Sequence, residues 1–257
     1  RSSIAWQQGG SQVRLFERVH LVGSGNFGFN LSHPSDCHVY AINGEAGIAL
    51  IDAGFGPAGE EIVAALKADS LDPEKVIQVL LTHCHVDHCG GAHFWSDRYG
   101  ANVLASAHTA AVLRSGDEEA THLKEARMAG VFPQDYQLQA CAADECAGGD
   151  ILDVGDISFR VISTPGHCRG HIAFHAKISG RHCLFSGDSV FYGGEIMIQN
   201  IPDCVLTEYC QTVIKLSGHP VDALLPGHFM LSLQDGHRHL DEAARVVRSL
   251  RIPSNVI

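Results

Sequence analysis

The sequence predicts an α/β (α+β) protein folded as a four-layer αββα sandwich, with helices on the outside and two sheets within. Short apolar runs bounded by glycine and proline recur along the 257 residues, which is typical of buried strands. The strands fall into two successive sets, and each set is followed by helix-forming segments. Each sheet can then bury one face against the other sheet and its second face against helices. We expect residues 1–257 to form a single domain.

The first set of strands surrounds the densest group of histidines. Apolar runs predict strands at residues 13–23, 37–42, 48–51, 76–81 and 103–105. Asn43-Gly44 lies between two of these runs and is typical of a β-hairpin. Residues 57–68 predict a helix, because Pro57 suits a first helical turn and apolar residues follow at helical spacing. A second helix is expected at residues 92–99.

The middle of the chain lacks a cluster of ligand-type residues. Residues 110–113 and 117–128 have helical patterns, and residues 141–149 are typical of a loop. The whole stretch, from about 108 to 149, is long enough to fold over a neighbouring site. We therefore expect a helical insertion at 108–149 that caps the active site.

The second set of strands follows this insertion. Apolar runs predict strands at residues 151–154, 157–162, 171–175, 182–186 and 223–225. Residues 203–216 predict a helix with Asp203 as its N-cap, and residues 241–250 predict a C-terminal helix.

Four ligand-type residues follow the apolar run 76–81 directly. They are His83, His85, Asp87 and His88. Gly90-Gly91 then ends any regular element, so these side chains are expected on a loop at the end of a strand, where open α/β sheets have their active sites. His83 and His85 point the same way on an extended segment. Four candidates are one more than a catalytic zinc takes from a protein, so the loop predicts two metal ions.

Three later segments share one pattern, in which a strand is followed by glycine and then by one ligand-type residue. They end at His167, Asp188 and His228. Asp52 stands at a strand end before glycine, which suits an aspartate that orients a metal-bound histidine; a turn or helix cap is the alternative. His171 is either a similar orienting group or a core residue.

The spacing His-x-His-x-Asp-His resembles the signature of the metallo-β-lactamase superfamily, and the three later motifs match that family in the same order. The resemblance spans about residues 13 to 240 and implies the metallo-β-lactamase fold. It implies that one metal is bound by His83, His85 and His167, a second by Asp87, His88 and His228, and that Asp188 bridges them. Two divalent ions are implied, zinc first, although imidazole and carboxylate ligands also accept iron or manganese.

The resemblance also implies a hydrolase. Two metal ions can share one water and lower its pKa to about 7, which supplies a hydroxide that attacks a carbonyl. We expect a binuclear enzyme that cleaves a small ester, thioester or lactone, with Asp87 as a catalytic proton acceptor.

Within the superfamily, Asp188 with Phe191 resembles glyoxalase II. The long stretch between His88 and His167 and the short segment after His228 are closer to metallo-lactonases. The alternatives are a mononuclear iron dioxygenase of the persulfide type, and a β-lactamase or phosphodiesterase.

Composition limits the partners. The net charge of −11 argues against binding nucleic acid. No apolar run approaches the ~20 residues that cross a bilayer, and the first ten residues lack the apolar core of a signal peptide. Nine cysteines without a CxxC pair favour a reducing compartment, and hence the cytoplasm; those beside candidate ligands are expected to pack as small apolar residues. We expect a small-molecule substrate, no nucleic acid and no membrane, and leave a homodimer open.

Overall fold

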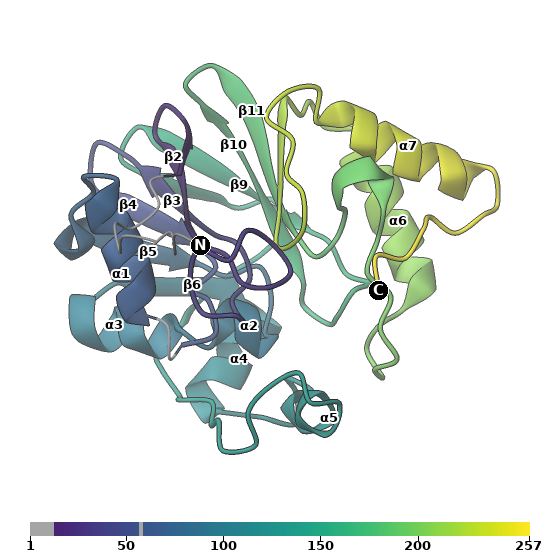
Figure 1. Cartoon of the computed structure of the whole chain (residues 1–257). Helices are drawn as coiled ribbons and strands as arrows, with labels where there is room; N and C mark the ends of the chain where they lie inside the picture. The colour runs from purple at the N-terminus through teal and green to yellow at the C-terminus, as the bar shows by residue number, and fades with distance from the viewer. Residues whose placement is uncertain (1–12, 57–58) are drawn as a thin grey trace, which may run out of the picture.

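A computed structural model describes residues 13–56 and 59–257. Within these residues the strands form two sheets (Figure 1). The first has seven strands, in the spatial order β1 (Arg14–Phe16), β2 (Val19–Gly23), β3 (Val39–Asn43), β4 (Ile48–Ile51), β5 (Val76–Leu80), β6 (Asn102–Ser106) and β7 (Asp144–Cys146). The second has five, in the order β12 (Ala223–Pro226), β11 (Arg181–Gly187), β10 (Ile172–Ile178), β9 (Ile157–Ser163) and β8 (Ile151–Val154).

Helices cover the outer face of each sheet (Figure 1). The first sheet is covered by α1 (Gly59–Ala68), α3 (Ala92–Tyr99) and α4 (Ala107–Ser115). The second is covered by α6 (Leu206–Leu216) and α7 (His237–Arg248). The short elements are α2 (Val86–Cys89), α5 (Leu123–Met128), and the 3₁₀ turns η1 (Pro73–Lys75) and η2 (Tyr192–Gly194). The predicted four-layer αββα sandwich is confirmed.

The two faces of each strand build different layers of the core, because neighbouring residues on a strand point in opposite directions. Val39 of β3 packs toward the helices, whereas Tyr40 and Ile42 pack between the sheets. In β11, Leu184 packs against the outer helices and Phe185 packs between the sheets.

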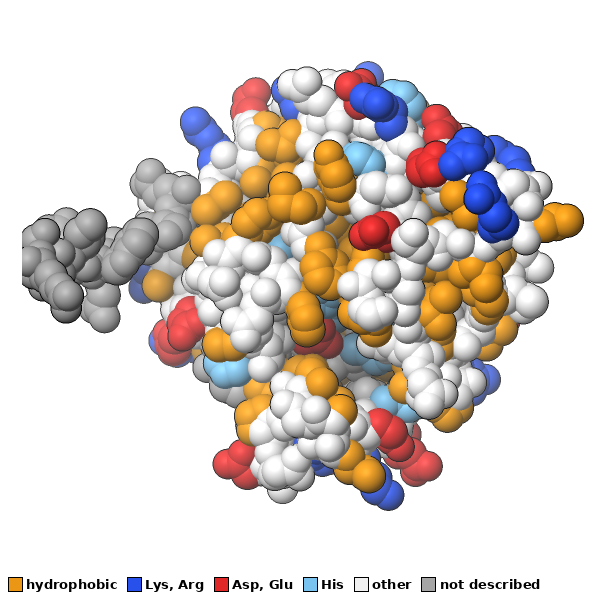
Figure 2. All heavy atoms as spheres, turned by 45° about the vertical axis from the view of Figure 1, so that its right-hand side comes forward, with side chains coloured by type: hydrophobic (Ala, Val, Ile, Leu, Met, Phe, Trp, Pro, Cys, Tyr) orange, Lys and Arg blue, Asp and Glu red, His pale blue; other side chains and the backbone are white. Residues whose placement is uncertain are grey.

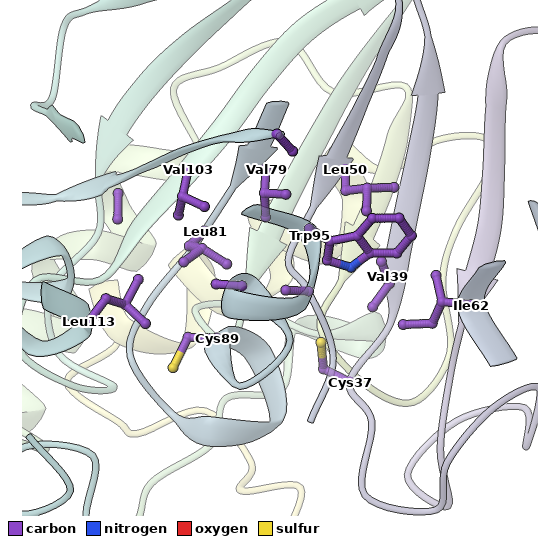
Figure 3. Close-up of a cluster of buried hydrophobic side chains, with 14 of the residues drawn as sticks. Cys37, Val39, Leu50, Ile62, Val79, Leu81, Cys89, Trp95, Val103 and Leu113 are labelled. Atoms are coloured by element: carbon purple, nitrogen blue, oxygen red, sulfur yellow. The ribbon is translucent and has the colours of Figure 1, made fainter. Parts of the chain in front are cut away.

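Figure 3 shows the cluster between the first sheet and its helices, where Trp95 of α3 joins Leu50 and Val39 of the sheet. Trp95 is fully buried. Burying each aliphatic side chain of this cluster, such as Leu50 or Val39, contributes about 1.5–3 kcal/mol, so the cluster holds the sheet edge rigidly under the loops that follow it.

The carboxyl ends of several strands meet at one edge of the sandwich. β4, β5 and β6 are parallel neighbours, and so are β11 and β12. β9 and β11 run in the same direction, since both are antiparallel to β10. The amide of Ile172 donates a hydrogen bond of 2.9 Å to the carbonyl of Thr82, which joins the two sheets at this edge. The segments that follow these strands therefore converge.

Most predicted elements are present, including the hairpin at Asn43-Gly44. The helix predicted at 57–68 is α1, although residues 57–58 lie outside the described residues. The C-terminal helix begins earlier than predicted, at His237.

Three predictions in the middle of the chain are wrong. The helix expected at 117–128 is only α5, because residues 118–122 form turns and His122 adopts a left-handed φ of 54°. Residues 141–149 contain β7, which completes the first sheet beside β6. Asp203 does not cap a helix, since α6 begins at Leu206 and its N-cap residue is Val205. The capping role of 108–149 stays a prediction.

Two further findings concern the described residues. Among the described residues, no helix has the length and apolar character that a membrane span requires. All nine cysteines lie in the described part of the chain, and none of them forms a disulfide there. A cytoplasmic location stays a prediction.

Candidate metal centre

The loop after β5 is held against the segment that follows β4. The amide of Ala53 donates to the carbonyl of His88 at 2.8 Å, and the amide of Gly91 donates to that of Gly54 at 2.9 Å. A Cβ atom on Gly91 would lie 2.1 Å from the carbonyl oxygen of Ala53, so this approach requires glycine. The Gly90-Gly91 pair therefore allows the loop to turn tightly under the candidate ligands.

The first set of candidate ligands comprises His83, His85 and His167. Nε2 of His83 lies 3.0 Å from Nδ1 of His85, and Nε2 of His167 lies 3.1 Å from that same Nδ1. All three side chains are buried. The ligand loop and the loop after β9 thus bring three ring nitrogens to one point.

The second set comprises Asp87, His88 and His228. Nε2 of His228 lies 3.2 Å from Nε2 of His88 and 3.2 Å from Oδ2 of Asp87. His88 and His228 are buried, whereas the side chain of Asp87 is 18% exposed. Asp87 is therefore the member of this set that reaches the solvent side.

Asp188 lies between the two sets. Its Oδ1 is 3.5 Å from Nε2 of His88, and its Oδ2 is 3.5 Å from Nε2 of His167 and 3.6 Å from Nε2 of His228. The structure therefore brings together all seven residues that the sequence singled out as ligands.

Hydrogen bonds orient the histidine rings. Nδ1 of His88 is 2.8 Å from Oδ2 of Asp52, and Nδ1 of His83 is 2.9 Å from Oγ1 of Thr82. Thr82 in turn donates its hydroxyl to Asp52. Nδ1 of His167 lies 3.1 Å from the carbonyl oxygen of Met197. Each contact places a ring hydrogen on Nδ1 and turns Nε2 toward the centre.

His171 has a similar orienting position. The amide of Asp188 donates a hydrogen bond of 3.0 Å to Nε2 of His171, and Nδ1 of His171 is 2.7 Å from the hydroxyl of Thr164. His171 thus holds the backbone of Asp188 and does not reach the centre with a free nitrogen.

The electrostatics differ between the two sets. Burial lowers the pKa of His83 well below its usual value, and that of His85 to about 3; neighbouring histidines add to both shifts. Burial also lowers the pKa of His167. Burial opposes charge on His88 as well, but the interactions of its ring with Cys37 and with the nearby carboxylates outweigh that effect and raise the pKa of His88 well above the usual value. The first set therefore offers neutral rings, whereas His88 carries a proton.

The donor atoms fit metal ions. Ligand atoms at ~2.0–2.1 Å from a tetrahedral zinc lie about 3.3 Å apart, close to the nitrogen separations in both sets. In the first set, three ring nitrogens face one another, and none of the three has a hydrogen to donate to the others. Oδ1 of Asp188 and Nε2 of His85 are buried without a hydrogen-bond partner among the described residues. A cation would satisfy the unpaired carboxylate oxygen and offset the facing lone pairs.

A cavity of about 630 Å³ opens over this centre. Phe27 overhangs it from the loop after β2, with its ring 6.1 Å from that of His228. Figure 2 shows acidic and histidine side chains in a hollow that hydrophobic side chains surround. The apolar lining residues are Phe27, Val86, Ala126, Ala129, Val131, Phe132, Met197, Ile198, Ile201 and Ile257.

Some residues of the site were not predicted from the sequence. Met197 contacts His167 through its backbone carbonyl, and a backbone contact leaves no residue pattern in the sequence. Cys168 places its Sγ within 4.8 Å of the first-set nitrogens, but burial raises the pKa of its thiol well above the usual value, which favours packing. His122 lines the pocket and contacts Asp203, although neither belongs to a recognisable motif.

Comparisons with known proteins agree with this geometry. The family model for the metallo-beta-lactamase superfamily matches residues 34–228. The acyl-coenzyme A thioesterase MBLAC2 of Bos taurus is 33% identical over 161 residues, which are 58% of this chain and 54% of the relative. A hydroxyacylglutathione hydrolase of Chelativorans sp. (strain BNC1) is 26% identical over 223 residues, which are 83% of this chain and 73% of the relative.

Solved structures agree on the fold. A metallo-β-lactamase of Cronobacter sakazakii superposes with a TM-score of 0.70 and 17% identity, covering 94% of this chain and 95% of that one. At that identity, the likeness shows the architecture alone. The chain spans about half of the bovine relative's length. The family model, in contrast, matches most of the length of this chain. This chain belongs to the metallo-β-lactamase superfamily.

Proposed function

We propose that this protein is a hydrolase that holds two divalent metal ions, zinc in the first place, and cleaves the thioester of an apolar acyl group. The position of Asp188 carries the proposal. One of its oxygens lies 3.5 Å from Nε2 of His88 and the other 3.5 Å from Nε2 of His167, so a single carboxylate faces both sets of histidines. Such a shared oxygen ligand suits a pair of cations held close together.

The two sets of side chains would divide the ions between them. His83, His85 and His167 would hold one, Asp87, His88 and His228 the other, and Asp188 both. When bound, two divalent ions supply an activated water and polarise the substrate carbonyl. Asp52 and Thr82 keep the rings of His88 and His83 in place, which spares the site a reorganisation during the reaction.

Asp87 is the candidate proton acceptor. Burial raises the pKa of Asp87, but His88 and His228 outweigh that effect and lower it below its usual value, so the carboxylate is ionised at neutral pH. Its side chain is partly exposed and lines the pocket. Oδ2 of Asp87 can therefore hold a proton that a water molecule in the pocket releases.

The lining of the pocket supports an apolar acyl group. Ten of its side chains are the apolar residues named above, whereas the charged ones are Asp87, Glu125 and Asp188. Neither lysine nor arginine lines this pocket among the described residues. A glutathione arm would bring carboxylates into the pocket without a cation to receive them, so the pocket suits an apolar acyl chain better than it suits that arm.

The relatives support the thioester bond. The bovine relative is named an acyl-coenzyme A thioesterase and the Chelativorans relative a hydroxyacylglutathione hydrolase, and both names specify thioesters. Esters and lactones share the carbonyl that the site would attack, so they remain substrates to test. A persulfide dioxygenase requires only one iron, so such an enzyme would not use the second set of ligands.

The test is a hydrolysis panel on protein of defined metal content. We expect about two metal ions per chain, turnover of neutral acyl thioesters, loss of turnover on chelation and recovery on adding zinc. S-lactoylglutathione, a lactone, a phosphodiester and a β-lactam serve as comparison substrates. One iron per chain together with oxygen consumption would overturn the proposal.

A further inference from the structure

His122 and Asp203 form a contact at the pocket that the proposed reaction does not use. Nε2 of His122 lies 2.7 Å from Oδ1 of Asp203, and their side chains are 16% and 20% exposed. His122 lines the pocket, and its ring lies 6.3 Å from that of His85. The pair therefore stands beside the candidate metal centre.

Asp203 is fixed independently of His122. Its Oδ2 accepts a hydrogen bond of 2.9 Å from the amide of Arg169, in the loop that carries His167. Burial raises the pKa of Asp203, but the amide of Arg169 and the ring of His122 outweigh it and lower the pKa below its usual value. Asp203 is thus an ionised carboxylate, which can only accept hydrogen bonds.

The backbone places His122 in this position although the conformation is unfavourable. Its φ of 54° lies in the left-handed region, which non-glycine residues rarely adopt. The amide of His122 donates to the carbonyl of Glu119, and its own carbonyl accepts from the amide of Ala126, each at 3.1 Å. The turn before α5 therefore holds the ring rigidly at the pocket wall.

The partner decides which hydrogen-bonding group the ring offers. Because Asp203 only accepts, Nε2 of His122 carries the hydrogen in the neutral ring, and Nδ1 keeps its lone pair. None of the described residues donates a hydrogen bond to this Nδ1. Ala126 and Ala129 lie in the same apolar lining, so a substrate that displaces water from this wall leaves Nδ1 unmatched unless it brings a donor.

We propose that His122 is a specificity-determining residue whose Nδ1 accepts a hydrogen bond from a hydroxyl or amide N–H group of the substrate near the scissile thioester, and that Asp203 is its positioning residue. This proposal rests on the proposed thioesterase function. The donor belongs either to the acyl group, as a 2-hydroxyl, or to the thiol arm, as an amide. In both cases the pocket combines an apolar wall with one directional acceptor.

The experiment measures kcat/KM ratios on the zinc-loaded protein. One series varies the acyl group of a single thioester between 2-hydroxy, 2-methoxy and unsubstituted. A second varies the thiol arm between an amide N–H and its N-methyl form. In one of the two series we expect the donor-bearing substrate to be preferred about tenfold, the usual effect of leaving a buried acceptor unpaired. The methoxy compound matches the size of the hydroxyl but cannot donate, so it should not share the preference.

Two variants test whether His122 and Asp203 cause the preference for donor-bearing substrates. In His122→Phe the ratio should fall to about one, and in Asp203→Asn it should weaken, because an amide can donate to Nε2 and move the ring hydrogen to Nδ1. His219→Phe, in the turn that follows α6 and outside the pocket lining, is the matched control and should keep the wild-type ratio. A ratio is insensitive to a general loss of active protein, which a purely structural role would cause.

Binding of non-hydrolysable thioether analogues to the same proteins separates this proposal from the proposed function. Absence of all thioester turnover would contradict the thioesterase, yet the affinity ratio of analogues with and without the donor would still test His122. Equal ratios in wild type and His122→Phe, for both series, would overturn the inference. A preference shared by the methoxy compound would also overturn it.

Discussion

Nδ1 of His88 lies 2.8 Å from Oδ2 of Asp52, a residue 36 positions earlier in the chain. Asp52 also accepts hydrogen bonds from the amide and hydroxyl of Thr82, and it adopts a left-handed φ of 60°. One carboxylate at the end of β4 therefore orients the two histidine rings of neighbouring sites, His88 directly and His83 through Thr82.

Asp52→Asn should weaken binding of the second metal ion about 10–100-fold, the usual effect of removing a partner of a ligating histidine. The amide keeps the size of the side chain but loses its charge and one acceptor. Zinc titration with a competing chelator measures the change. Asp97→Asn, at an exposed carboxylate on α3, is the control. Equal zinc affinity in both variants would contradict an orienting role for Asp52.

Metal binding should release protons unequally from the two sets. Burial lowers the pKa of His83, His85 and His167, so at pH 7 the first set is neutral and has no proton to lose. The pKa of His88 is raised, so a metal ion at the second set must displace its proton. Affinity at the second set should therefore rise with pH and that at the first set should not, between about pH 6 and 8. Calorimetry in buffers of different ionisation enthalpy measures the released protons, and equal release at both steps would contradict this assignment.

Gly91→Ala should destabilise the fold by about 2–4 kcal/mol, since its Cβ would lie 2.1 Å from the carbonyl oxygen of Ala53 and force the ligand loop away from it. Gly218→Ala is the matched control, because its Cβ would meet only the carbonyl of Lys215, at 3.4 Å. Denaturant unfolding of the metal-free proteins gives both values. Similar stabilities for the two variants would show that the loop can shift without cost.

Asp188→Asn should reduce the metal content from about two ions per chain to one or fewer, because the amide lacks the charge that two neighbouring cations need. We expect kcat/KM to fall at least a thousandfold, as a lost transition-state contact and a lost ion combine. Elemental analysis and thioester assays check both effects. Asp241→Asn, an exposed residue of α7, should change neither. Two retained ions in Asp188→Asn would argue against a shared carboxylate.

Much of the candidate site follows from local patterns. His83 to His88 directly follow β5, and Asp188 and His228 directly follow β11 and β12, so strand ends and glycines place each one. Parallel strands bring such ends to the same edge, which is why separate motifs predict a single centre.

The elements that the sequence failed to predict depend on distant partners. Asp203 precedes a helix, so it matched the pattern of an N-cap, but its carboxylate binds His122, 81 residues earlier. The residues 117–122 matched a helix by periodicity, yet the left-handed φ of His122 interrupts it. β7 is too short and polar to be recognised alone, and it is a strand because it pairs with β6.

The sequence by itself determined the layers of the fold and the seven residues gathered at the strand ends, because both depend on short-range periodicity and on where strands stop. Only the tertiary structure decided how closely these residues approach one another around Asp188, what lines the pocket and which nitrogen of His122 remains free. Those properties depend on distances between segments far apart in the chain, and the packing of the two sheets sets these distances.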